Sequence, residues 1–336
     1  MRQMHFCIAS LIAGLLWFGC DKGKDVSNNK IDIIFDTDAN NELDDQHALA
    51  YLMMNDSVFN VVGITTNATM NGGSIDEHYK EAERVVALCN KSGQIKLFKG
   101  ADKSFEEIRN TLSDPQFDGY QSVDFIIEQA LKHTGENKLT VLAVGKLTNM
   151  ALALEKNPGI ADKIRFVWLG ANYPLPGEYN LVNDIPSMNY ILNTNIEFEM
   201  VTVRYGMETG TDAVKVTKEN ALATMPGLGP VIEKPIIGRH GGEFNNFGDY
   251  SADLFKHIDY PDSTQSRALY DMAAVAIIKN PAWAKKTEIP CPIMIDNVWI
   301  EQPDNQRKIT LWENFDKAGI IEDFYQTLKR HTVREQ

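Results

Sequence analysis

The residues best suited to chemistry lie in one short segment, residues 36–45, which reads Asp-Thr-Asp-Ala-Asn-Asn-Glu-Leu-Asp-Asp. Half of these side chains are carboxylates, and like charges this close repel unless a cation or hydrogen bonds compensate them. Dense carboxylate oxygens suit hard cations such as Ca²⁺ or Mg²⁺. Because the segment directly follows an apolar run, residues 31–35, we interpret it as a site at the end of a buried strand rather than as a solvated acidic loop.

Two known acidic motifs can be compared with this segment. An EF-hand loop starting at Asp36 needs Gly in its sixth place and Glu in its twelfth, where this chain has Asn41 and His47, so that motif is excluded. Haloacid-dehalogenase-type phosphatases also carry Asp-x-Asp after their first strand, and Asp36 would then be the nucleophile. That family expects Thr or Val where this chain has Asn40, and it does not need the later aspartate pair. A phosphatase stays as the enzyme alternative.

The elements that must position these residues alternate along the chain. Apolar and β-branched runs predict strands at residues 31–35, 58–66, 139–144, 164–169 and 198–203. Helical spacing of apolar residues predicts helices at residues 75–89, with Ser74 as a cap, and at 147–154, 185–192, 268–278 and 312–331. This order predicts an α/β fold, a doubly wound and mainly parallel sheet with helices on both faces. Ligands of such sheets bind beyond the carboxyl ends of the strands.

Five segments in order resemble the nucleoside hydrolase family of the inosine-uridine-preferring type. Residues 36–45 resemble its opening motif, Asp-x-Asp-x-Gly-x-Asp-Asp, with two extra residues before Asp44-Asp45. The later matches are VVGITT at 61–66, VGKLTN at 144–149 with Lys146 in place of Pro, LGAN at 169–172 followed by GEYN at 177–180, and Tyr270-Asp271 in place of His-Asp. The resemblance runs from about residue 31 to residue 278.

The resemblance implies hydrolysis of the N-glycosidic bond of a ribonucleoside, with Ca²⁺ as cofactor and Mg²⁺ less expected. It implies that Asp38 is both the general base and a metal ligand, and that Asp36 supports the loop from behind. The further metal ligands it implies are Asp45, the backbone carbonyl of Thr148, and Asp271. The substrate-binding residues it implies are Asp44, Asn71 and Asn180 at the ribose hydroxyls, and Asn172 and Glu178 at the 5′ side.

Two residues are candidates for assisting the leaving base. Tyr270 stands where family members have a proton-donating His, and a tyrosine can donate a hydrogen bond but transfers its proton less readily. His240 lies in a glycine-rich aromatic segment, residues 239–248, which we interpret as a mobile lid or, alternatively, an ordinary surface loop. The non-enzyme alternative is a lipid-anchored nucleoside- or sugar-binding protein that lost catalysis through Tyr270.

Several candidates also have structural interpretations. Asn172 and Asn180 could be turn residues, Asp271 or Thr148 could cap a helix, Asn67 competes with Asn71 for one role, and His47 is expected to be structural.

Composition and the amino terminus bound the remaining possibilities. The 336-residue chain has a net charge of −13, which argues against nucleic-acid partners, and 43% hydrophobic residues, typical of globular proteins. Four cysteines are too few for a disulfide scaffold, although a Cys89–Cys291 pair stays open. The apolar run at residues 7–19 predicts a signal peptide (1–19) with lipidation at Cys20, or ordinary secretion. A polar tether (20–30) and one domain (31–336) follow. We therefore expect an exported, lipid-anchored protein acting on a small nucleoside or ribosyl compound, with homo-oligomerisation left open.

Overall fold

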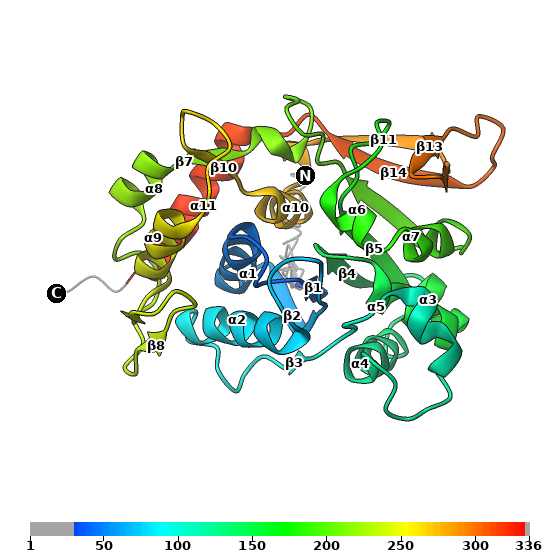
Figure 1. The fold of residues 1–336 in the computed structure, drawn as a ribbon, viewed down its shortest axis with the longest axis horizontal. Coiled ribbons are helices and arrows are strands. Elements are labelled where there is room, and N and C mark those ends of the chain that lie inside the picture. Colours follow the sequence, from blue (N-terminus) through cyan, green and yellow to red (C-terminus); the bar gives the residue numbers. More distant parts are fainter. Residues whose placement is uncertain (1–29, 333–336) are drawn as a thin grey trace, which may run out of the picture.

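The computed structural model describes residues 30–332, and its centre is one eight-stranded sheet (Figure 1). In chain order its strands are β1 (Ile31–Thr37), β2 (Phe59–Thr66), β3 (Leu97–Phe98), β4 (Leu139–Ala143), β5 (Ile164–Leu169), β6 (Glu197–Val201), β11 (Lys285–Pro290) and β14 (Lys308–Glu313). The spatial order is β11-β14-β6-β5-β4-β1-β2-β3, and all neighbouring pairs are parallel except β11 and β14. The predicted mainly parallel α/β sheet is confirmed.

Helices cover both faces of this sheet (Figure 1). Along β1, Ile33 and Phe35 enter one hydrophobic core while Ile34, between them, enters the other, which is the alternation of a sheet buried on both sides. The first core receives side chains of α1 (Asp44–Met54), α2 (Ile75–Leu88), α9 (Phe247–His257), α10 (Tyr270–Lys279) and α11 (Lys317–His331). The second receives those of α3 (Phe105–Ile108), α4 (Tyr120–Ala130), α5 (Thr148–Lys156), α6 (Tyr179–Asn183) and α7 (Ile185–Leu192).

Shorter elements complete the fold around the sheet. They are α8 (Lys218–Thr224), the pair β7 (Lys215–Thr217) and β10 (Ser266–Ala268), the hairpin β8 (Ile236–Ile237) and β9 (Glu243–Phe244), and the hairpin β12 (Ile293–Ile295) and β13 (Val298–Ile300).

The winding of the chain reverses direction next to β1. From β1 the chain adds β2 and β3 on one side, and it then returns to place β4 on the other side. Where the winding reverses, the connections leaving two adjacent strands diverge to opposite faces, which opens a crevice at their carboxyl ends. The segment after β1, residues 38–43, therefore lies at the expected position of a ligand site.

Most predicted elements are confirmed, with bounds that differ by two residues at most. The helix predicted at residues 312–331 is wrong at its start, because Trp312 belongs to β14, where it pairs with Val201 of β6 and its indole donates to Glu199. The helix α11 begins after Asp316, whose side chain accepts a hydrogen bond from Gly319 N–H. Ser74 is the cap of α2 as predicted, with Glu77 completing a capping box.

Three expectations concern the cysteines, the amino terminus and the membrane. Cys89 and Cys291 are both buried as free thiols, so the disulfide that the sequence left open does not form. The predicted signal peptide, the lipidation at Cys20 and nearly all of the tether lie outside the described residues. Within residues 30–332, none of the helices combines the length and apolar character needed to cross a membrane.

Candidate active site

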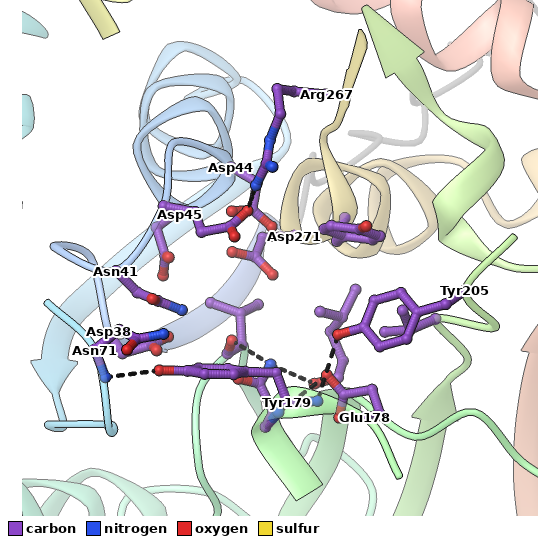
Figure 2. Close-up of a pocket in the computed structure, with 16 residues that line it drawn as sticks. Asp38, Asn41, Asp44, Asp45, Asn71, Glu178, Tyr179, Tyr205, Arg267 and Asp271 are labelled. Atoms are coloured by element: carbon purple, nitrogen blue, oxygen red, sulfur yellow. Dashed lines mark hydrogen bonds and ion pairs between the residues drawn. The ribbon is translucent and has the colours of Figure 1, made fainter. Parts of the chain in front are cut away.

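A cavity of about 270 Å³ lies at the carboxyl ends of the central strands (Figure 2). Each of β1, β4, β5 and β6 contributes its last residue or one just beyond it, namely Asp38, Val144, Leu169 and Val203. The other lining residues are Asn41, Glu42, Asp44, Asp45, Asn71, Glu178, Tyr179, Asn180, Tyr205, Arg267, Tyr270 and Asp271. Parallel strands thus bring distant parts of the sequence to one edge.

Three carboxylates converge on one side of this cavity. Asp44, Asp45 and Asp271 each offer an oxygen, and these oxygens lie within 4.8 Å of one another. Asp44 and Asp45 open α1, Asp271 lies in the first turn of α10, and these two helices pack together. Asp271 is not the cap of α10, because that position belongs to Leu269. Its carboxylate faces the cavity together with those of the other two aspartates (Figure 2).

Burial and mutual repulsion disfavour negative charge in this cluster. Burial raises the pKa of Asp38 to about 7 and that of Asp44 to about 7. The pKa values of Asp45 and Asp271 lie well above their usual range, from burial first and the neighbouring aspartates second. A hard divalent cation removes this penalty, and carboxylate oxygens are the donors that Ca²⁺ and Mg²⁺ take. The residues present therefore fit a bound metal ion.

Asp38 is fixed by the loop that carries the two extra residues. The Thr69 hydroxyl donates to Asp38 Oδ2 at 2.6 Å, and Asn41 N–H donates to the Asp38 carbonyl at 2.9 Å, closing a turn. The Asn40 side-chain amide donates to the Gly72 carbonyl at 2.6 Å. The two additional residues therefore form a turn that is hydrogen-bonded to Gly72, and Asp38 still lines the cavity.

Asp36 lies behind the cavity rather than in it. Its Oδ1 accepts from Thr65 at 2.6 Å and from Asn149 at 2.7 Å, and its Oδ2 accepts from Asn67 at 3.1 Å. Both oxygens are therefore engaged, which fits the supporting role and does not favour Asp36 as a phosphatase nucleophile. Asn67 belongs to this buried network and does not line the cavity, so it does not compete with Asn71 for the substrate.

Glu178 and Asn180 line the opposite wall. The Glu178 carboxylate accepts three backbone N–H groups, from Ala171, Asn180 and Leu181, at 2.9–3.0 Å. The Asn180 amide donates to the carbonyls of Val144 and Leu169, at the ends of β4 and β5. These side chains are rigidly held at the strand ends, and both reach the cavity.

The other predicted binding residues divide into two groups. Asn71 lines the cavity, and its backbone N–H donates to the Tyr179 hydroxyl at 2.9 Å. Asn172 lies outside it and accepts from Tyr205 N–H at 3.1 Å, so it positions a lining residue. Thr148 is also outside, and its hydroxyl donates to Asp184.

Tyr270 lines the cavity, and its hydroxyl is engaged by a residue that does not line it. The hydroxyl donates to Asp212 Oδ1 at 2.9 Å, and burial together with Asp212 raises its pKa above the usual value. Its ring lies edge to face with Tyr205, with centroids 6.0 Å apart.

The structure does not bring His240 into the carboxylate cavity. It lines a neighbouring cavity of about 270 Å³, which shares Asn41, Glu42, Asn71 and Arg267 with the first. His47 is buried in the core, between the Leu43 carbonyl and the Ser251 hydroxyl, as expected for a structural histidine.

Several lining residues were missed by the sequence analysis. Tyr179 lies between the two predicted residues Glu178 and Asn180, and Glu42 lies inside the acidic segment, so proximity in sequence could have indicated both. Tyr205 follows β6 by four residues, and Arg267 lies in β10 just before Tyr270. Arg267 forms an ion pair with Glu42 across the mouth of the cavity.

Residues 33–321 match the family model described as inosine-uridine preferring nucleoside hydrolase. This match covers most of the chain, including every residue that lines the cavity. The chain belongs to the nucleoside hydrolase family. As a member, it is a hydrolase acting on N-glycosyl bonds.

Solved nucleoside hydrolases share this family fold over nearly their whole length. A plant nucleoside hydrolase is 16% identical, with a TM-score of 0.70 over 90% of this chain and 99% of its own. A purine-preferring ribonucleoside hydrolase from Gardnerella vaginalis is 18% identical, with a TM-score of 0.68 over 90% and 99%. An inosine-uridine preferring enzyme from Bacillus anthracis is 18% identical, with a TM-score of 0.58 over 89% and 99%. At these identities the likeness shows the fold alone.

A curated relative, an uncharacterised protein of Schizosaccharomyces pombe, is 27% identical over 118 residues. That match spans 33% of this nucleoside hydrolase family member and 37% of the relative's length.

Proposed function

We propose that this family member hydrolyses the N-glycosidic bond of a ribonucleoside to ribose and free base, with Ca²⁺ as cofactor. The observation that carries the proposal is the convergence of four buried aspartates, Asp38, Asp44, Asp45 and Asp271, on one cavity at the reversal point of the sheet. The acidic lining favours a sugar that becomes cationic, as in the oxocarbenium-like transition state of glycoside hydrolysis.

Calcium would be held by Asp45 and Asp271, and the Asp44 carboxylate lies within reach of both. The family resemblance adds Asp38, which lines the same cavity, and the backbone carbonyl of Thr148. Bound Ca²⁺ supplies a positioned water of lowered pKa and oxygen-binding positions for the ribose hydroxyls. Mg²⁺ fits less well, because it retains several of its own waters.

Asp38 is the proposed general base. Thr69 holds one carboxylate oxygen, and the side chain faces the cavity, where it can accept a proton from the attacking water. Burial raises the pKa of Asp38, which strengthens the carboxylate as a proton acceptor, and a bound cation would keep it ionised.

The remaining lining residues suit a ribose and its base. We assign the ribose hydroxyls to Asp44, Asn71 and Asn180, and the 5′ side to Glu178, with Asn172 acting through Tyr205. For the leaving base we assign the rings of Tyr179, Tyr205 and Tyr270 as contact surfaces. Tyr270 then contributes its ring rather than a proton, because its hydroxyl is engaged by Asp212.

The proposed place of action follows from the amino terminus. A signal peptide and a lipid anchor at Cys20 would expose the enzyme to nucleosides outside the cytoplasm.

A product assay tests this proposal. The chain from Asp21 onward is incubated with inosine, uridine, adenosine and cytidine, with Ca²⁺ or with a chelator, and free base is separated by chromatography. The corresponding nucleotides are incubated in parallel, and released phosphate is measured. Calcium-dependent base release is expected. Phosphate release from nucleotides with nucleosides left intact would point to the phosphatase alternative, and tight nucleoside binding without free base would point to the binding-protein alternative.

A further inference from the structure

We infer that His240, Asp253 and His257 form a binding site for a divalent transition metal, with Zn²⁺ as the best-matched ion. The cluster lies outside the carboxylate cavity, and the inference does not depend on the proposed nucleosidase activity. Each side chain offers one ligand atom, and these atoms lie within 4.8 Å of one another. Two imidazoles and one carboxylate are a ligand set that zinc takes when its fourth position stays open.

Two elements bring the three ligands together. Asp253 and His257 are four residues apart in α9 and so share one side of that helix, while His240 comes from the turn between β8 and β9 (Figure 1). His240 Nδ1 is 3.6 Å from Asp253 Oδ2. His257 Nδ1 lies 2.9 Å from the Asp253 backbone carbonyl oxygen and 3.3 Å from Asp253 Oδ1, so its Nε2 is the nitrogen left for a metal ion. Ligand atoms around a tetrahedral zinc ion lie about 3.3 Å apart, because each bond is about 2.0–2.1 Å long. The 3.6 Å between His240 Nδ1 and Asp253 Oδ2 is close to that spacing, and the three ligand atoms lie within 4.8 Å of one another.

The carboxylate has an oxygen without a partner. Asp253 Oδ2 is buried and accepts no hydrogen bond from any residue in the described part of the chain. Its 3.6 Å separation from His240 exceeds hydrogen-bond length. A buried carboxylate oxygen left in this state costs free energy that a donor or a cation would offset. A metal ion bound by both residues would supply the missing interaction.

The charges around the cluster leave His240 able to bind a metal. Burial, followed by the neighbouring Arg239 and His257, lowers the pKa of His240, while Asp253 acts in the opposite direction. The neutral ring is the form that binds a metal ion. Arg239 Nε lies 3.3 Å from His240 Nε2, so the open nitrogen is Nδ1, which faces Asp253. Ligation at Nδ1 places the ring proton on Nε2, and Arg239 must then turn its Nε away.

The site is connected to the mouth of the carboxylate cavity. Arg239 Nη1 donates to the carbonyl of Glu42 at 2.9 Å, and Glu42 pairs with Arg267 at the rim. A metal ion that joins the β8–β9 turn to α9 would hold the backbone that carries Arg239, whose guanidinium contacts the acidic segment at Glu42.

Zinc titration of the untagged full chain tests the inference. Calorimetry is done in saturating Ca²⁺, so that Ca²⁺ competes for the carboxylate cavity. One Zn²⁺ per chain is expected, with affinity at least about tenfold weaker in each of His240→Ala, Asp253→Asn and His257→Ala. His133→Gln is the matched control, since His133 pairs with Asp32 in another part of the fold, and it should bind zinc normally.

One further double variant and a spectrum show which site binds the zinc ion. Asp45→Asn/Asp271→Asn should retain the zinc site, and Co²⁺ in place of Zn²⁺ should give a visible absorption band of nitrogen ligation that each histidine variant loses. Circular dichroism checks that every variant is folded. The inference is overturned if the chain binds no Zn²⁺, if His240→Ala and His257→Ala bind it normally, or if the double aspartate variant loses it. These experiments do not measure base release, so failure of the zinc inference and failure of the proposed nucleosidase activity can be distinguished.

Discussion

At the scale of single residues, Asp38 combines burial with access to the cavity. Its Oδ2 accepts the Thr69 hydroxyl, its backbone closes the turn of the acidic segment, and its side chain lines the same cavity as Asp45 and Asp271. Asp36, two residues earlier, has both oxygens occupied by donors. The end of β1 at Thr37 separates the two, because Asp36 is still in the strand and Asp38 opens the turn that follows it.

The first prediction concerns Asp38. Asp38→Asn should lower turnover by roughly 10²–10⁴-fold, the usual contribution of a general base, while the melting temperature without Ca²⁺ stays equal or rises because a buried charge is removed. Steady-state base release and thermal melting measure the two effects. Asp32→Asn, at the opposite end of the same strand, is the control and should keep wild-type turnover. Wild-type turnover in Asp38→Asn would remove Asp38 as the base.

The second prediction concerns Tyr270. Because its hydroxyl donates to Asp212 and its ring lines the cavity, Tyr270→Phe should change kcat/KM by less than about fivefold, whereas Tyr270→Ala should lower it more. Steady-state kinetics with one nucleoside distinguish these variants. A loss of about 100-fold in Tyr270→Phe would instead identify the hydroxyl as a proton donor to the leaving base.

At the scale of elements, buried polar side chains hold the helices behind the cavity. Asp184 precedes α7, and its carboxylate accepts from Ser187 N–H in that helix, from Phe105 N–H in α3 and from the Thr148 hydroxyl in α5. It therefore joins three helices that cover one face of the sheet. Thr148, the predicted carbonyl ligand, is positioned by this network.

The third prediction tests this junction. Asp184→Ala should lower the free energy of unfolding by about 3 kcal/mol, because it leaves two buried N–H groups and a buried hydroxyl without their acceptor. Urea denaturation measures the loss. Asp124→Ala removes a partly exposed carboxylate that pairs with Lys156, and it should cost less than about 1 kcal/mol. Equal losses of unfolding free energy in the two variants would show that the Asp184 hydrogen bonds stabilise the fold no more than a surface ion pair does.

The elements also show what could be predicted from sequence and why. Short apolar strands and the acidic segment are local signals, so β1, β2, β4 and β5 and the cluster at Asp38–Asp45 could be predicted. The positions of Tyr205 and Arg267 at the carboxylate cavity depend on the spatial order of the strands, which local periodicity does not encode. Trp312 was assigned to a helix because its strand and the following helix are both apolar and only three residues apart.

At the scale of the whole molecule, the fold buries several aspartates around one cavity, and burying their negative charges lowers the stability of the folded state. Asp38 and Asp44 have folded pKa values of about 7, against an ordinary value of 3.8. Since these pKa values are raised, the stability linked to them is fully present below about pH 4 and is lost as the pH rises through about 7. A bound divalent cation would reverse that loss.

The fourth prediction follows from this linkage. In chelator, the melting temperature should fall between pH 6 and pH 8, and Ca²⁺ should raise it more at pH 8 than at pH 6. His47 does not contribute to the pH dependence between pH 6 and pH 8, because burial lowers its pKa to about 4. Thermal melts with and without Ca²⁺ give the answer, and Asp45→Asn should show a smaller calcium effect. A calcium effect that shrinks toward pH 8 would contradict the prediction.

The most direct test of the central claim is a calcium titration of metal-depleted protein, with bound Ca²⁺ and the rate of free-base release measured in the same samples. The account predicts one Ca²⁺ per chain in the carboxylate cavity, base release that rises in proportion to its occupancy, and loss of both in Asp45→Asn/Asp271→Asn. Full base release in the presence of chelator, or a rate that does not follow calcium occupancy, would contradict it.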